Sequence, residues 1–230
     1  MRDATPIIIP AFQAEASIAD VAGRSRKFSD HVLVVDDGST DATEKQAIQA
    51  GAQVLRHPHN QGKGRALRTG FEYFFSRGHE EVITLDADGQ HLPEEIPKLL
   101  AARELQADMV IGSRATLFAG MHGVRLWSNT LSSKVISAVA GEAIDDVQSG
   151  FRLYTRKLIQ TTGFAEPRFE AESAVVVRAI RYGLRIALTP VELGFVDGRR
   201  TSHYRPLVDS LRIAMAVTRA RFDTVGAHIA

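Results

Sequence analysis

Two carboxylates one residue apart, Asp86 and Asp88, directly follow a short apolar segment near the middle of the chain. The segment 82–85 is rich in β-branched residues and is typical of a buried strand. Two ionised carboxylates at the end of such a strand repel each other unless a cation lies between them. Oxygen ligands favour Mg²⁺ or Mn²⁺ over zinc, and phosphate oxygens commonly complete the coordination of such an ion. The alternative is a polar turn that precedes a helix beginning near Pro93.

Length and composition limit the kinds of protein to consider. The chain has 230 residues, long enough to bury a sizeable core, with 24% charged residues and a formal net charge of +1. These values exclude a disordered chain and a strongly basic nucleic-acid-binding protein. The sequence contains no cysteine, which excludes disulfides, thiolate zinc sites and a cysteine nucleophile. It shows neither a signal peptide nor an apolar stretch of the roughly 20 residues that cross a bilayer, so we expect a cytoplasmic protein.

Apolar segments alternate with helix-periodic segments along the first half of the chain. The expected strands are 7–9, 31–35, 53–56, 82–85 and 109–112, and the expected helices are 15–27, 41–50, 63–77 and 93–105. This alternation predicts an α/β fold with a parallel sheet and helices on both of its faces. In such sheets ligands bind outside the carboxyl ends of the strands.

Polar residues follow four of the predicted strands, at 10–13, 36–39, 86–88 and 112–114. One polar strand end is ordinary, whereas four at one edge predict a site for a ligand with several charges. Asp37 is a candidate nucleoside ligand because a carboxylate accepts hydrogen bonds from base N–H groups and ribose hydroxyls. Thr40 and Asp41, by contrast, are expected to cap the next helix.

The segment Asn60–Arg65 contains two glycines and Lys63 just before a predicted helix. It does not match the Walker phosphate-loop pattern. Its backbone N–H groups and Lys63 are nevertheless suited to a diphosphate at a helix N-terminus. A flexible turn with solvated basic residues is the alternative.

The second half of the sequence contains further polar segments. A helix is expected over 125–139, with Arg125 and Asn129 one turn apart, either on the surface or facing the site. Asp145, Asp146 and Ser149 lie in a dense polar loop that resembles the wall of a site. Carboxylates at 170 and 172 open the next predicted helix, where the helix dipole also favours them.

The C-terminal segments carry basic residues. Pro190 interrupts a predicted strand over 186–195 and indicates an edge strand. Residues 199–205 hold three arginines and a histidine, a composition suited to phosphate. A helix over 206–222 has an apolar stripe beside arginines, so it either lies on a membrane surface or packs on its own domain.

Five motifs occur in a characteristic order: Ile7–Pro10, Val34–Ser39, Asp86–His91, Ile111–Arg114 and Ser149–Arg152. Together they resemble family 2 glycosyltransferases, in particular the branch that transfers mannose or glucose to dolichyl or polyprenyl phosphate. The resemblance covers about residues 5–205. It implies a GT-A fold with a mixed, mostly parallel sheet in one domain over 1–230. That domain would comprise a nucleotide-binding half over about 5–115, an acceptor half over about 116–205, and a C-terminal amphipathic helix over 206–230.

The resemblance also implies roles for single residues. The nucleoside would contact Pro10, Ala11, Phe12 and Asp37, and Mg²⁺ or Mn²⁺ would be bound by Asp86, Asp88 and Gln90. Phosphates would be attended by Arg114, Arg125 and a late arginine, a role that we assign to Arg199 because Gly198 stands at the expected position. We also expect Lys63, Ala87 and Ser149 to contact the nucleotide sugar, and we count Asp88 and Asp146 with Arg114, Arg125 and Arg199 as catalytic candidates.

Two features depart from the family pattern. The motif Pro-x-Tyr-Asn-Glu is replaced by Pro10-Ala-Phe-Gln-Ala-Glu15, so the glutamate that touches the nucleoside comes one residue late. The base therefore stays open between GDP and UDP sugars. The branch often carries C-terminal transmembrane helices, and no segment of this sequence has their character.

The expected activity is the inverting, metal-dependent transfer of a hexose from a nucleotide diphosphate sugar, of the GDP-mannose or UDP-glucose type, to a polyprenyl phosphate. With that acceptor the protein would bind peripherally to the inner face of the membrane. A hydroxyl acceptor would instead require a general base, for which Asp145, Asp146 and Glu170 are candidates. The remaining alternatives are a sugar-phosphate nucleotidyltransferase and a non-catalytic sugar-nucleotide-binding module. No nucleic-acid partner is expected, and the sequence gives no indication of an oligomeric state.

Overall fold

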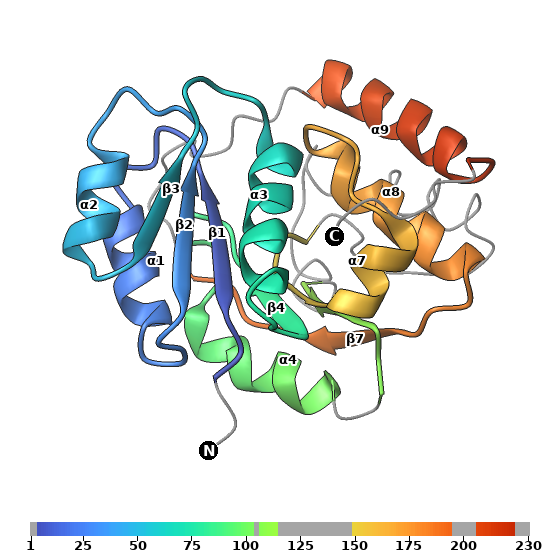
Figure 1. Ribbon diagram of the computed structural model, residues 1–230, viewed down its shortest axis with the longest axis horizontal. Coiled ribbons are helices and arrows are strands. Elements are labelled where there is room, and N and C mark those ends of the chain that lie inside the picture. The colour runs from blue at the N-terminus through green and yellow to red at the C-terminus, as the bar shows by residue number, and fades with distance from the viewer. Residues whose placement is uncertain (1–3, 104–105, 115–148, 195–205, 224–230) are drawn as a thin grey trace.

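The computed structural model describes residues 4–103, 106–114, 149–194 and 206–223, and its centre is a mixed sheet of seven strands (Figure 1). The strand order is β3-β2-β1-β4-β6-β5-β7. The strands are β1 Ile7–Ala11, β2 Val32–Asp36, β3 Gln53–Arg56, β4 Glu81–Thr84, β5 Met109–Ser113, β6 Arg152–Thr155 and β7 Ile186–Pro190. All neighbouring pairs are parallel except the two that involve β6.

Helices cover both faces of this sheet, as the sequence predicts. Those that pack on one face are α1 Ile18–Ser25, α2 Thr43–Gln49 and α4 Ile96–Arg103, which follows the 3₁₀ turn η1 Pro93–Glu95. Those that pack on the other face are α3 Lys63–Phe75, α7 Arg156–Thr162, α8 Glu170–Arg181 and α9 Pro206–Ala220. None of the described helices is long and apolar enough to span a bilayer.

The alternation of side chains along the central strands builds two cores. In β1, Ile8 joins the core beneath α3 and α8, whereas Ile7 and Ile9 join the core beneath α1 and α4. All three side chains are fully buried. Central parallel strands covered on both faces therefore consist of continuous apolar residues, which explains the uninterrupted apolar segments of the sequence.

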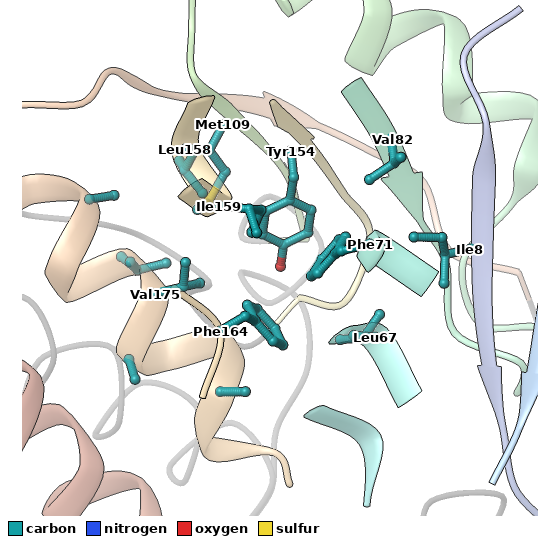
Figure 2. Packing of buried hydrophobic residues seen from close by; sticks show 14 of the residues in the cluster. Ile8, Leu67, Phe71, Val82, Met109, Tyr154, Leu158, Ile159, Phe164 and Val175 are labelled. Carbon is teal, nitrogen blue, oxygen red and sulfur yellow. The ribbon is translucent and has the colours of Figure 1, made fainter. Parts of the chain in front are cut away.

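An aromatic cluster fixes α3 against the sheet. The ring of Phe71 on α3 lies 5.2 Å from that of Tyr154 on β6 and 5.0 Å from that of Phe164, which follows α7 (Figure 2). Gly70 brings α3 close to β1, because a Cβ at this position would lie 2.6 Å from a methyl group of Ile8. The helix is thus held so that its N-terminal residue, Lys63, lies at the carboxyl end of the sheet.

The second half of the sheet shows what alternation alone does not predict. Strand β6 enters between β4 and β5 and runs antiparallel to both. Strand β7 pairs with β5 at the sheet edge and ends at Pro190, as expected of an edge strand. The helix expected over 125–139 lies outside the described residues.

Candidate functional site

A pocket of about 740 Å³ lies at the carboxyl ends of β1, β2 and β4. Its volume is within the range of small-molecule binding sites. The residues that line it come from the end of β1, from both aspartate motifs, and from the starts of α1, α3, α8 and α9. They are Pro10, Ala11, Phe12, Gln13, Ala14, Ala16, Ser17, Asp37, Asn60, Gly62, Lys63, Ala66, Asp86, Ala87, Asp88, Arg168, Phe169, Asp209 and Arg212.

Most of the candidates from the sequence that the structure describes meet in this pocket. Those that line it are Pro10, Ala11, Phe12, Asp37, Lys63, Asp86, Ala87 and Asp88. Gln90 and Arg114 are half-buried and Ser149 is fully buried, and none of these three lines the pocket. Three further candidates, Arg125, Asp146 and Arg199, lie outside the described residues, as does Asp145.

Lys63 joins two carboxylates that are far apart in the sequence. Its Nζ lies 2.7 Å from Oδ1 of Asp86 and 2.8 Å from Oε2 of Glu172 on α8. Only 14% of the Lys63 side chain is exposed, and only 6% of that of Glu172. The ammonium therefore compensates two carboxylates that would otherwise lie at the bottom of the pocket without a cation.

The ionisation of these groups follows from their positions. Burial opposes the charge on Lys63, but Asp86 and Glu172 outweigh it and hold the pKa of Lys63 above its ordinary value. Burial likewise opposes the charge on Asp86, but Lys63 and then His91 hold the pKa of Asp86 below its usual range. Burial and the nearby charge of Asp86 together raise the pKa of Asp88. A further cation beside Asp88 would remove this repulsion.

Gly150 leaves room for the side chains of Asp86 and Lys63. A Cβ at this position would lie 2.4 Å and 2.7 Å from the carboxylate oxygens of Asp86 and 2.7 Å from Nζ of Lys63. The glycine is held in place because Thr84 Oγ1 donates a hydrogen bond of 2.9 Å to its carbonyl oxygen. Any side chain here would displace Asp86 or Lys63.

The donor set fits a hard divalent cation. Asp86 and Asp88 offer oxygen ligands at the end of β4, and Oδ1 of Asp88 accepts the N–H of Gln90 at 2.9 Å, which bends the chain around the site. Among the described residues, no group of three or more histidine, aspartate or glutamate side chains is arranged to hold a metal ion. The arrangement therefore suits Mg²⁺ or Mn²⁺ with a ligand phosphate and water in the remaining positions, and not a site made of protein ligands alone.

Asp37 organises the loop that forms one side of the pocket. Its buried carboxylate accepts hydrogen bonds from the backbone N–H groups of Gln61, at 2.9 Å, and Gly62, at 2.7 Å. Oδ1 also lies 2.7 Å from Nδ1 of His57. Asp37 thus fixes the segment that leads into α3 while it lines the pocket.

Glu15, the glutamate that comes one residue late in the first motif, lies outside the pocket lining. Oε2 of Glu15 accepts the N–H of Ala42 at 3.0 Å, just before α2. The expected capping of α2 by Thr40 and Asp41 is wrong in its position, because Ala42 is the N-cap residue. Asp41 accepts the N–H of Thr43 at 3.0 Å from just outside the helix, and Thr40 accepts a hydrogen bond from Gln13. Glu15 therefore supports the junction with α2, and it is absent from the pocket lining.

Two further candidates lie close to this site. Ser149 accepts a hydrogen bond of 2.7 Å on its carbonyl oxygen from the buried Arg152, which also donates to the carbonyl of Glu172. Glu170 opens α8 as a buried carboxylate, and one of its oxygens has no hydrogen-bond partner among the described residues.

The sequence reading missed several residues of the site. Arg168, Phe169, Asp209 and Arg212 line the pocket although they follow the five motifs in the chain. The position of Glu172 at a helix start does not predict its contact with Lys63. Sequence carries little signal for these residues because only the tertiary fold brings α8 beside α3 and the first turn of α9 to the pocket.

Solved structures with the same fold include glucosyl-3-phosphoglycerate synthase from Mycobacterium tuberculosis in complex with Mn²⁺, UDP and glucosyl-3-phosphoglycerate. Its TM-score is 0.72 at 23% identity, over 96% of this chain and 80% of that chain. The same enzyme, solved with Mg²⁺ and UDP, gives a TM-score of 0.71 at 21% identity. At such identities the likeness shows the fold alone, which is GT-A.

Sequence comparison identifies the family. The undecaprenyl-phosphate mannosyltransferase of Micrococcus luteus is 30% identical over 200 residues, which cover 80% of this chain and 81% of that protein. The polyprenol monophosphomannose synthase of Mycolicibacterium smegmatis is 31% identical over 168 residues, 68% of this chain and 63% of that protein. The model of glycosyl transferase family 2 matches residues 7–163. The chain therefore belongs to glycosyltransferase family 2 and is an enzyme of that family.

Proposed function

We propose that the protein transfers a hexose, with inversion, from a nucleotide diphosphate sugar to a polyprenyl phosphate. The observation that carries this proposal is the pocket in which Asp86, Asp88 and Lys63 meet Asp37 and the end of β1. Paired carboxylates and an ammonium at the carboxyl edge of an α/β sheet suit a diphosphate, and the neighbouring wall suits a nucleoside. The names of the two mannosyl-transferring relatives support the lipid acceptor.

Different residues would contact the nucleoside and the diphosphate of the donor. Pro10, Ala11 and Phe12 would pack against the nucleoside, and the carboxylate of Asp37 would face it. Lys63 would exchange part of its contact with Asp86 for a phosphate oxygen. Arg114 would approach from the end of β5, where its charge already lowers the pKa of Asp86.

Asp86, Asp88 and Gln90 would hold Mg²⁺ or Mn²⁺, which when bound neutralises charge on the diphosphate. In the transfer, an oxygen of the acceptor attacks the anomeric carbon as the bond from that carbon to the diphosphate oxygen breaks. The leaving nucleoside diphosphate takes the electron pair. Lys63 and Arg114 stabilise the negative charge that develops on it.

Whether hexose transfer needs a general base depends on the acceptor. A polyprenyl phosphate presents an oxygen that is already ionised, so the displacement requires no strong general base. Arg114 and Arg125 are proposed to position it, whereas Ser149, expected from the sequence to help, is fully buried and absent from the pocket lining. This acceptor would place the protein at the cytoplasmic face of the membrane.

A hydroxyl acceptor is the second candidate. The observation in its favour is the buried carboxylate of Glu170, one oxygen of which has no hydrogen-bond partner among the described residues. A hydroxyl group would have to lose a proton during transfer, and Glu170 could accept it.

The test is a transfer assay with radiolabelled GDP-mannose and UDP-glucose, each offered with polyprenyl phosphate and with simple sugars in the presence of Mn²⁺. We expect labelled lipid from one donor and none with Asp88→Asn. Full transfer to a soluble sugar with none to the lipid phosphate would overturn the lipid acceptor. Pyrophosphate release from a nucleoside triphosphate and a sugar phosphate would identify a nucleotidyltransferase instead.

A further inference from the structure

Helix α9 has two apolar faces on opposite sides. On the inner face Ile213, Val217 and Ala220 are buried in the core that contains α8. On the outer face Leu211 is 62% and Met215 56% exposed, with Val208 one turn before them and Phe222 just beyond the helix end. An inner face is enough to hold a helix on its domain, so the outer stripe has no role in the fold itself.

Arginines outnumber carboxylates around this outer stripe. Arg212, Arg219 and Arg221 are exposed beside it. Two carboxylates accompany them: that of Asp209, which is 4% exposed and pairs with Arg212, and that of Asp223, whose side chain is 33% exposed. An exposed apolar stripe with an excess of arginines beside it is complementary to an anionic lipid surface. A second copy fits poorly, because a two-fold contact would bring the arginines of both copies together.

The first turn of α9 also reaches the pocket. Asp209 and Arg212 both line it, and Nη1 of Arg212 lies 3.3 Å from Oδ1 of Asp209. Arg168, which precedes α8 and is exposed, lines the same pocket. The basic edge of the outer stripe is therefore also the rim of the candidate active site (Figure 1 shows α9 on the outside of α8).

We propose that α9 docks on an anionic lipid surface through the outer stripe Val208, Leu211 and Met215, and that this docking holds the pocket rim at the level of the lipid headgroups. Arg168 and Arg212 then receive the phosphate of a lipid acceptor as it enters. The docking stands on α9 alone, whereas the role of the two arginines rests on the proposed function.

Co-sedimentation with vesicles tests the docking. We expect binding to vesicles of phosphatidylcholine mixed with phosphatidylglycerol, weaker binding to phosphatidylcholine alone, and weakening by salt. The variant Leu211→Ser/Met215→Ser should bind the mixed vesicles at least about tenfold less tightly, because it removes apolar groups from the interface. The matched control is Ile48→Ser/Leu188→Ser, which removes two comparably exposed apolar side chains elsewhere, 56% and 41% exposed, and should bind like the wild type.

The charges are tested separately. Arg219→Gln/Arg221→Gln should weaken binding to the mixed vesicles by about fivefold per arginine and leave binding to phosphatidylcholine unchanged. Equal binding by the Leu211/Met215 variant and its control, or no binding to either vesicle, would overturn the docking. A wild-type dimer that Leu211→Ser/Met215→Ser converts to a monomer, without vesicle binding, would overturn it in favour of self-association.

The role at the rim is tested with Arg168→Gln. We expect the KM for polyprenyl phosphate to rise about tenfold while the Kd for the nucleotide sugar stays unchanged. A changed donor Kd with an unchanged acceptor KM would overturn this role. Vesicle binding needs neither donor nor acceptor, so the two proposals can fail separately. Vesicle binding without any hexose transfer would refute only the proposed function. Transfer to detergent-solubilised polyprenyl phosphate without vesicle binding would refute only the docking.

Discussion

Replacing Lys63 with methionine removes the cation that compensates two carboxylates. Its Nζ lies 2.7 Å from Asp86 and 2.8 Å from Glu172, whose side chains are 25% and 6% exposed. Removing one partner of a buried ion pair costs about 3–5 kcal/mol. Because Asp86 is partly exposed and can regain water, we expect Lys63→Met to lower the free energy of unfolding by about 3 kcal/mol.

A divalent cation should restore part of this loss. In the wild type the ammonium already lies against Asp86, whereas in Lys63→Met that contact is lost and a metal ion beside Asp86 would supply a replacement positive charge. Saturating Mn²⁺ should therefore stabilise the variant more than the wild type, and urea unfolding followed with and without Mn²⁺ measures both effects. The matched control is Arg68→Met on the same helix, which breaks the more exposed pair with Glu72 and should cost about 0.5 kcal/mol or less.

The outcomes that refute this reasoning are specific. If Lys63→Met and Arg68→Met lose the same small stability, the ammonium does not compensate buried charge. If Mn²⁺ stabilises Lys63→Met no more than the wild type, no cation binds beside Asp86 in place of the lysine.

Two further variants probe the walls of the pocket. Gly150→Ala places a Cβ 2.4 Å from an oxygen of Asp86, so kcat/KM for hexose transfer should fall at least about tenfold. The control is Gly23→Ala, where a Cβ meets nothing within 4 Å and transfer should stay unchanged. Asp37→Ala leaves the buried N–H of Gly62 and its neighbour without an acceptor, so urea unfolding should show a loss of about 3 kcal/mol and titration a weaker affinity for the nucleotide sugar.

Each of these two predictions has a result that would contradict it. Wild-type transfer by Gly150→Ala would show that Asp86 tolerates displacement. Unchanged stability of Asp37→Ala would show that the loop before α3 holds its conformation without the carboxylate.

Much of the fold is predictable because its signals are local. Central strands such as β2 are apolar throughout since both faces are covered, and the helices between them show their own periodicity. The antiparallel insertion of β6 is not predictable in this way. Its four residues pair with β4, about 70 residues earlier in the chain, and no local pattern encodes that register.

Some residues of the site are likewise predictable from the sequence, and others are not. Asp37, Asp86 and Asp88 follow strands, so the topology of a parallel sheet brings them to one edge. The partner of Lys63 on α8, Glu172, depends on how two helices pack, and the pocket lining by α9 depends on a segment far along the chain. Such contacts follow from tertiary packing, which residue types and spacing do not specify.

The most direct test of the central claim is the thermal stability of the protein in the presence of nucleotide sugars, with and without Mn²⁺. Binding to the native state raises the apparent stability by an amount that grows with the logarithm of the ligand concentration once this exceeds the Kd. We expect one nucleotide diphosphate sugar to raise the Tm more when Mn²⁺ is present, and Asp88→Ala to abolish that metal-dependent part while keeping its fold. A metal-dependent shift that survives unchanged in Asp88→Ala would contradict the assignment of Asp86 and Asp88 as the metal and diphosphate site.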